Sequence, residues 1–320
     1  MLEWFHPYRP YRQYFGRMRR ARLVLRFAIR FGQHYYLRPC RKNLGDLTAQ
    51  EQERSPYNAL YDAMFSLILS GYKRLAKHEL REDSAKLLFY VRRWMRQIDD
   101  EFERILASKD TPDLDRIQQA TEVTFCRERA LGFAEKTGSA EAIETTVDSF
   151  LTSHFARYLQ TIDGAMEAAD VAQALEMVRL DSGIWLQTVM GCVRQFNRLP
   201  VNPRVDRNLL HVGIAGTLAD DLLDVGFDYR DGDSNVLVSI LKNEPGEFET
   251  MLAAGPAVGA LGARWWEENC PVSFQRMFAL IEYHHCQIES PHLMATTDLM
   301  LYPVMLGYDY KAQIRKQNQP

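Results

Sequence analysis

Apolar residues recur at helical spacing along almost the whole chain from Ser55 to Leu306, and no useful stretch alternates as a strand does. This spacing gives each helix an apolar face that must be buried, so it predicts helices packed on helices, an all-α fold. We expect helices over 55–78, 82–107, 113–136, 140–168, 170–195, 204–228, 236–241, 247–268, 272–289 and 292–306.

Short helix-breaking segments, and no long linker, separate the expected helices. Proline or glycine marks the breaks near 111–113, 137–139 and 200–203, and polar turn residues around Gly232 predict a loop over 229–235. No internal repeat is present. We therefore expect one α-helical domain over 46–310, after a basic N-terminal arm or cap over 1–45 and before a polar tail over 311–320.

The N-terminal segment is strongly basic. Between Arg9 and Lys42 every charged side chain is positive, and the arginines interrupt any apolar stretch that a secretory signal would need. We interpret it as a helix or arm folded against an acidic body. A transit peptide, or a basic amphipathic helix in peripheral contact with a membrane, is the alternative.

The overall composition points to a cytoplasmic protein. The formal net charge of −3 provides no general attraction to nucleic acid, so we expect no nucleic-acid partner. The five cysteines never form a CxxC pair and read as reduced thiols. No apolar run reaches the roughly eighteen residues that a transmembrane helix needs.

An acidic ladder lies on one of the most apolar predicted helices. Asp220, Asp224 and Asp228 are spaced four apart, so a continuous helix stacks them along one face, between leucine, alanine and valine neighbours. Carboxylates stacked on a buried helix cost several kcal/mol unless cations compensate. Magnesium suits one or two carboxylates together with substrate phosphates.

A second acidic cluster lies upstream at Asp99, Asp100 and Glu103, with Asp99 and Glu103 on one helical face. The same predicted helix carries Arg92, Arg93, Arg96 and Arg104. An ion-paired surface helix is therefore the alternative to a metal site.

At these two clusters the chain resembles the class I terpene synthases of the isoprenoid synthase superfamily. Asp99, Asp100 and Glu103 match the first metal motif, DDxx(D/E). The second motif, (N/D)D(L/I/V)x(S/T)xxxE, matches 220–223, while Asp224 replaces its Ser or Thr and Asp228 its Glu. The resemblance implies a single-domain helical bundle around a central cavity, in which both motifs and three magnesium ions hold the substrate diphosphate. It implies a lyase, a monomer or homodimer, that ionises and cyclises a linear C15 or C20 prenyl diphosphate and releases diphosphate.

The resemblance extends to 177–183. By that likeness Arg179 senses the diphosphate, and the turn formed by Asp181, Ser182 and Gly183 helps to trigger ionisation. Arg230 is a second candidate for diphosphate contact. The aromatic side chains near the motifs are candidates for stabilising a carbocation, because ring faces attract cations. These are Phe65, Phe89, Trp185 and Phe196.

Departures from the family pattern keep other functions open. The usual Arg-Tyr pair near the C-terminus is missing, 220–224 resembles the second motif of chain-elongating prenyltransferases, and 224–228 resembles a segment of the head-to-head squalene and phytoene synthases. Gly226 is unfavourable in a helix, so we expect the helix to loosen before Asp228. A non-catalytic helical scaffold with a basic docking arm is the alternative from another class.

Overall fold

The computed structural model describes residues 55–81, 83–108, 110–165 and 170–306, and all regular structure within these ranges is helical. The predicted all-α class is confirmed. The side chains of some residues inside helices, Glu103 among them, are not described. The helices are α4 (Ser55–Ala76), α5 (Ser84–Ala107), α6 (Leu114–Gln118), α7 (Thr121–Glu135), α8 (Ala140–Ala165), α9 (Val171–Val178), the π-helix η4 (Arg179–Ile184), α10 (Trp185–Phe196), α11 (Pro203–Asp231), α12 (Val236–Leu241), α13 (Pro245–Ala254), the 3₁₀-helix η5 (Val258–Leu261), α14 (Ala263–Asn269), α15 (Pro271–Cys286) and α16 (Pro291–Leu306).

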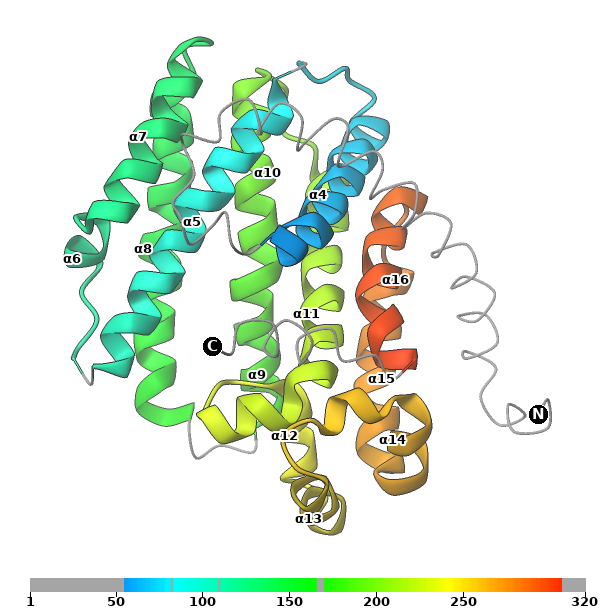
Figure 1. The fold of residues 1–320 in the computed structure, drawn as a ribbon. Coiled ribbons are helices and arrows are strands. Elements are labelled where there is room, and N and C mark those ends of the chain that lie inside the picture. The colour runs from blue at the N-terminus through cyan, green and yellow to red at the C-terminus, as the bar shows by residue number, and fades with distance from the viewer. Residues whose placement is uncertain (1–54, 82, 109, 166–169, 307–320) are drawn as a thin grey trace.

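The long helices stand side by side, and the short helices α12, α13 and α14 gather at one end of the molecule (Figure 1). Helix α5 packs between α7 and α10, α8 packs against α7 and α10, and α16 packs against α4 and α11. Helix α11 contacts α10, α15 and α16 as well as η4. It is therefore the central helix of the arrangement.

Two buried apolar clusters form the core, and α11 contributes to both. Val205, Leu209 and Val212 in its first half belong to a cluster with α4, α5, α7, α8 and α10. Leu218 and Leu222 in its second half belong to a cluster with α12, α14 and α15. A helix that meets protein on several sides needs apolar residues on more than one face, and α11 buries apolar side chains along most of its length.

Helix α11 is longer than predicted. Its N-terminus is capped by Asn202, whose side chain accepts hydrogen bonds from two backbone amides, and it ends at Gly232, which takes a left-handed φ of 82°. The expected loosening at Gly226 is wrong, because the helix continues to Asp231. A Cβ on Gly226 would lie 2.6 Å from the backbone oxygen of Pro256, so glycine at this position permits a close backbone approach.

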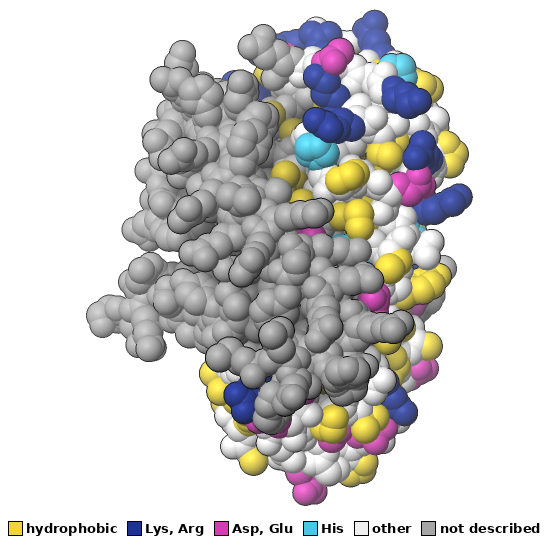
Figure 2. Space-filling view, turned by 90° about the vertical axis from the view of Figure 1, so that its right-hand side faces the viewer, with side chains coloured by type: hydrophobic (Ala, Val, Ile, Leu, Met, Phe, Trp, Pro, Cys, Tyr) yellow, Lys and Arg dark blue, Asp and Glu magenta, His cyan; other side chains and the backbone are white. Residues whose placement is uncertain are grey.

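Three predicted helices are interrupted. The segment 113–136 forms α6 and α7, the segment 170–195 contains η4, and the segment 247–268 is divided by a glycine-rich stretch over 255–262. Gly255 and Gly262 have φ values of 83° and 81°, which end a helix regardless of the apolar spacing around them. None of the described helices is long and apolar enough to span a membrane. On the face shown in Figure 2, Lys and Arg side chains gather mainly at one end and Asp and Glu side chains mainly toward the other.

Candidate active site

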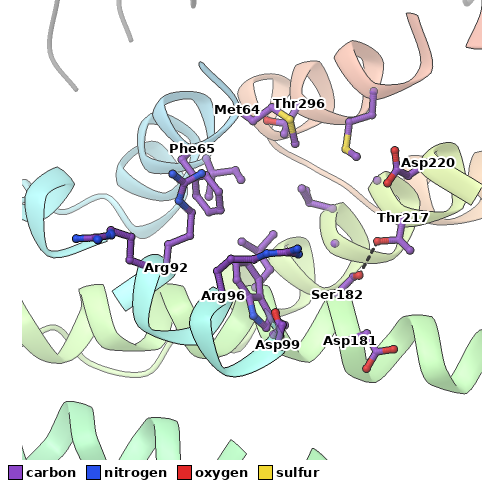
Figure 3. Close-up of a pocket in the computed structure, with 18 of the residues that line it drawn as sticks. Met64, Phe65, Arg92, Arg96, Asp99, Asp181, Ser182, Thr217, Asp220 and Thr296 are labelled. Carbon is purple, nitrogen blue, oxygen red and sulfur yellow. Dashed lines mark hydrogen bonds between the residues drawn. The ribbon is translucent and has the colours of Figure 1, made fainter. Parts of the chain in front are cut away.

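A cavity of about 450 Å³ opens between α4, α5, η4, α10, α11 and α16. One part of its wall is apolar and comes mainly from α4, α10 and α16, and the other part carries charged and hydroxyl side chains from α5, η4 and α11 (Figure 3). A pocket that joins an apolar wall to a few convergent polar groups is the usual form of a small-molecule site. The apolar lining is Met64, Phe65, Ile68, Trp185, Leu186, Val212 and Met300, and the polar lining is Arg92, Arg93, Arg96, Gln97, Asp99, Asp100, Asp181, Ser182, Thr217, Asp220 and Thr296.

Helix α5 brings the first acidic cluster to the cavity. Asp99 and Asp100 both line it. Asp100 accepts a hydrogen bond from Gln97 at 3.2 Å and forms an ion pair with Arg96 at 2.9 Å. The ion pair joins residues four apart on one helix, as expected of an ion-paired helix surface. Here the pair lies at the edge of a cavity, so acid and base are both available to a ligand.

Helix α11 brings only the first member of the acidic ladder to the cavity. Asp220 lines it, whereas Asp224 and Asp228 do not. Asp228 accepts a hydrogen bond from the side chain of Asn235 at 2.8 Å. Burial raises its pKa to about 7 against the lowering effect of that bond, and the negative charge of Asp220 raises it further. That electrostatic effect agrees with carboxylates stacked along one helical face.

Asp221, the second residue of the matched motif, has a structural role. Its side chain is 6% exposed, and Oδ2 accepts a hydrogen bond from the backbone amide of Val236 at 2.9 Å. Asn235, the N-cap of α12, donates to the backbone oxygen of Asp221 at 2.9 Å. These bonds fasten the start of α12 to α11, so the adjacent Asp220 and Asp221 serve different purposes.

The π-helix η4 lies where the sequence predicted a break near a glycine. Gly213 of α11 faces it so closely that a Cβ there would lie 2.2 Å from the backbone oxygen of Ser182. Gly183 likewise meets the side chain of Leu210, and the hydroxyl of Ser182 accepts a hydrogen bond from Thr217 at 2.5 Å. π-Helical turns occur often at functional sites. This one places Asp181 and Ser182 at the cavity (Figure 3).

Asp181 is paired with a histidine that the sequence analysis did not identify. Nε2 of His154, on α8, lies 2.5 Å from Oδ1 of Asp181. The side chain of Asp181 is 39% exposed, but it borders the cavity and is otherwise surrounded by protein. Desolvation raises the pKa of Asp181 to about 7 and lowers the pKa of His154. Both shifts favour the neutral forms of the two side chains, and perturbed groups of this kind are frequent at functional sites.

The two arginines proposed from the sequence do not line the cavity. Arg179 binds Glu176 with both ends of its guanidinium group, at 2.6 and 2.7 Å. Arg230 binds its neighbour Asp231 in the same way, at 2.7 and 2.8 Å. The cations at the cavity are instead three arginines of α5.

The α5 arginines lie on the same helix as Asp99. Their helical spacing from Asp99 was the feature of the sequence that could have identified them as cavity residues. Arg92 lies over the ring of Phe65, with its guanidinium carbon 5.3 Å from the ring centroid. Arg93 is only 5% exposed although it lines the cavity. Arg92, Arg96 and Asp99 follow one another at helical spacing and so share a face. No comparable signal linked His154 to Asp181, because the contact depends on how α8 packs.

The predicted aromatic residues divide into two groups. Phe65 and Trp185 line the cavity, and their ring centroids are 6.3 Å apart. Phe89 packs against Tyr90 at 5.6 Å, and Phe196 is buried against Phe133 at 5.7 Å. Gly183 lies behind the cavity wall, in contact with α11.

Within the described part of the chain, no three His, Cys, Asp or Glu residues are grouped as a ready-made metal site. The donors at the cavity still suit magnesium. Asp99 and Asp100 on one helix and Asp220 on another offer carboxylate oxygens, and Mg²⁺ commonly takes one or two carboxylates and completes its shell with water and substrate phosphates.

The fold and the site together define an all-α protein with a cavity whose wall is lined partly by acids and arginines and partly by apolar side chains. Comparison with known protein families and with curated protein sequences finds no match to this chain.

Proposed function

We propose that the protein is a magnesium-dependent class I terpene synthase that ionises a linear prenyl diphosphate of C15 or C20. The observation that carries this proposal is the shared cavity of Asp99, Asp100 and Asp220. These carboxylates come from α5 and α11, far apart in the chain, yet they line one space whose opposite wall is apolar. A ligand with an anionic head and a hydrocarbon tail fits such a division.

The arginines of α5 support an anionic head group. Arg92, Arg93 and Arg96 line the cavity on the same helix as Asp99 and Asp100. A guanidinium group can bind two phosphate oxygens at once, and its charge stabilises a leaving diphosphate. We therefore assign diphosphate binding to these three side chains before Arg179 and Arg230, which do not line the cavity.

Asp99, Asp100 and Asp220 would hold the magnesium ions, three in number by the family resemblance. Bound magnesium supplies positive charge that stabilises the departing diphosphate. The protein's own groups do the rest. Ser182 and Thr217 offer hydroxyl groups beside Asp220, while Phe65 and Trp185 exclude water and present ring faces to an allylic cation.

Incubating the purified full-length chain with C10, C15, C20 and C25 prenyl diphosphates and magnesium tests the proposal. Extracts are analysed by mass spectrometry and diphosphate release is measured. We expect a C15 or C20 substrate to give a product of the same carbon number. A head-to-head coupling enzyme would double the carbon count, and a chain-elongating enzyme would require isopentenyl diphosphate.

Matched variants test the site. Asp99→Asn and Asp220→Asn should each lower the rate of diphosphate release about 100-fold or more, because each removes charge where the metal and the leaving group meet. Asp115→Asn, an exposed carboxylate on α6, is the control and should have no effect. Thermal stabilisation by inorganic diphosphate with magnesium provides a readout without turnover. A scaffold protein would show neither stabilisation nor product.

A further inference from the structure

Two histidines from different helices meet away from the cavity. Nδ1 of His211 on α11 lies 2.9 Å from Nδ1 of His284 on α15, and the two rings are inclined by 45°. A hydrogen bond between two imidazole nitrogens requires a proton on one of them and a lone pair on the other. The two Nδ1 atoms therefore face each other at short range.

We propose that His211 and His284 form a binding site for one divalent d-block ion, Cu²⁺ or Ni²⁺, coordinated through both Nδ1 atoms. Imidazole nitrogen binds such ions at about 2.0–2.1 Å. Two bonds of this length at a right angle separate the nitrogens by about 2.9 Å, whereas a tetrahedral angle separates them by about 3.3 Å. The observed 2.9 Å thus matches neighbouring positions of a square-planar or octahedral ion.

The helices that carry the two histidines are fastened together next to the site. Oδ1 of Asn208, one turn before His211, accepts hydrogen bonds from the backbone amides of Glu289 and Ser290 at 2.6 and 3.4 Å. Arg204, one turn earlier, binds Glu289 through Nε at 2.7 Å. These contacts fix the segment that follows α15 against α11. The ligands are therefore held in place before an ion binds, which reduces the entropy lost on binding.

Coordination through both Nδ1 atoms agrees with the proton count of two neutral imidazoles. The proton that the two Nδ1 atoms share moves to Nε2 of the same ring, so binding of the ion releases no net proton.

The neighbouring residues of 284–286 are not part of the site. His285 is fully buried and its Nε2 lies 3.0 Å from Asp298 on α16, on another side of α15. Adjacent residues on a helix point in different directions, so 284 and 285 cannot chelate one ion. Since no third His, Cys, Asp or Glu joins the pair within the described ranges, water completes the coordination.

The test is titration of untagged full-length protein, stripped with chelator and then freed of it, with Cu²⁺, Ni²⁺ and Zn²⁺ followed by calorimetry. Variants His211→Ala and His284→Ala remove one ligand each, and His211→Phe keeps a ring in the helix contact while removing its nitrogens. His78→Ala, an exposed histidine after α4, and Cys286→Ser, the exposed thiol beside the pair, are the controls.

We expect one Cu²⁺ per chain, with nitrogen hyperfine structure from two imidazoles in its electron paramagnetic resonance spectrum. Each His211 and His284 variant should weaken binding at least tenfold, and the two controls should not change it. Ni²⁺ and Zn²⁺ should bind more weakly than Cu²⁺. Folded His211→Phe protein that binds Cu²⁺ as tightly as wild type, or a spectrum with a single nitrogen ligand, would overturn the proposal. Because none of these readouts uses a prenyl substrate, the result is independent of the proposed enzyme activity.

Discussion

The closest backbone contact in the site gives a prediction whose size can be worked out. A methyl group on Gly213 would lie 2.2 Å from the backbone oxygen of Ser182 and 2.9 Å from the Cα of Gly183. Ordinary carbon–oxygen contacts are more than 1 Å longer, as dispersion contacts near about 3.5 Å indicate. Gly213→Ala must therefore move η4 away from α11, because neither partner is the flexible end of a side chain.

Gly191→Ala isolates the cost of that displacement. Gly191 lies in the α10 helix, and a Cβ there would meet only a methyl group of Thr146 at 3.7 Å, an ordinary contact. Both substitutions gain about 1 kcal/mol from the higher helix propensity of alanine. The difference between them is therefore the overpacking cost alone, about 2–3 kcal/mol for a contact between two backbones.

Urea unfolding followed by circular dichroism measures both variants against wild type. Gly191→Ala should raise the unfolding free energy by about 1 kcal/mol, and Gly213→Ala should lower it by about 1–2 kcal/mol. The midpoints of thermal unfolding of the two variants should differ by roughly 3–5 °C, because a chain of 320 residues has a large unfolding entropy. Equal stability of the two variants would refute the close approach of η4 to α11, and with it the placement of Asp181 and Ser182 at the cavity.

Three further predictions concern charge in and beside the site. In the presence of chelator, the Asp228→Asn variant should be more stable than wild type by about 1–3 kcal/mol at pH 8, and this difference should vanish below pH 4. The reason is that the raised pKa of Asp228 in the folded protein contributes stability at low pH, and this stability is lost as the pH rises toward 7. Urea unfolding at several pH values measures the difference, and a difference that does not change with pH would contradict the prediction. His154→Gln should shift the pH profile of turnover measured with a prenyl diphosphate, since Nε2 of His154 contacts Asp181, while Gln118→Glu on α6 should leave the profile unchanged. Asn235→Ala should lower the unfolding free energy by about 2–4 kcal/mol, because it removes the N-cap of α12 and the hydrogen-bond donor to both Asp221 and Asp228. Urea unfolding measures this loss. A loss below about 1 kcal/mol would mean that α12 is held mainly by its apolar contacts.

Helix type and approximate position followed from apolar spacing, but helix interruptions did not. The spacing of apolar residues indicates which face of a helix is buried. It does not distinguish η4 from an α-helix, because η4 buries Leu180 as a continuous α-helix would. The π-helix over 179–184 packs closely against Gly213, a residue of another helix, and apolar spacing within 179–184 carries no information about that contact. The break over 255–262 did have a local signal, since Gly255 and Gly262 both adopt positive φ. The apolar residues around them obscured it.

The candidate site was predictable only where one helix carries several of its members. Asp99 and Asp100 belong to one turn of α5, and the arginines near them were visible in the sequence but were interpreted as ion-pair partners. Spacing correctly indicated that Asp220 is stacked with other carboxylates. It could not indicate that the cavity ends near Asp220, because the boundary depends on Met300 of α16 and Thr217 of α11.

Arg179 and Asp181, two residues apart, face different surroundings, as residues i and i+2 of a helix do. Arg179 lies beside Glu176, three residues earlier, while Asp181 borders the cavity and reaches His154. Helical spacing thus predicts that only one of the two side chains can face the cavity. Which of them does so depends on how η4 packs against Gly213 of α11.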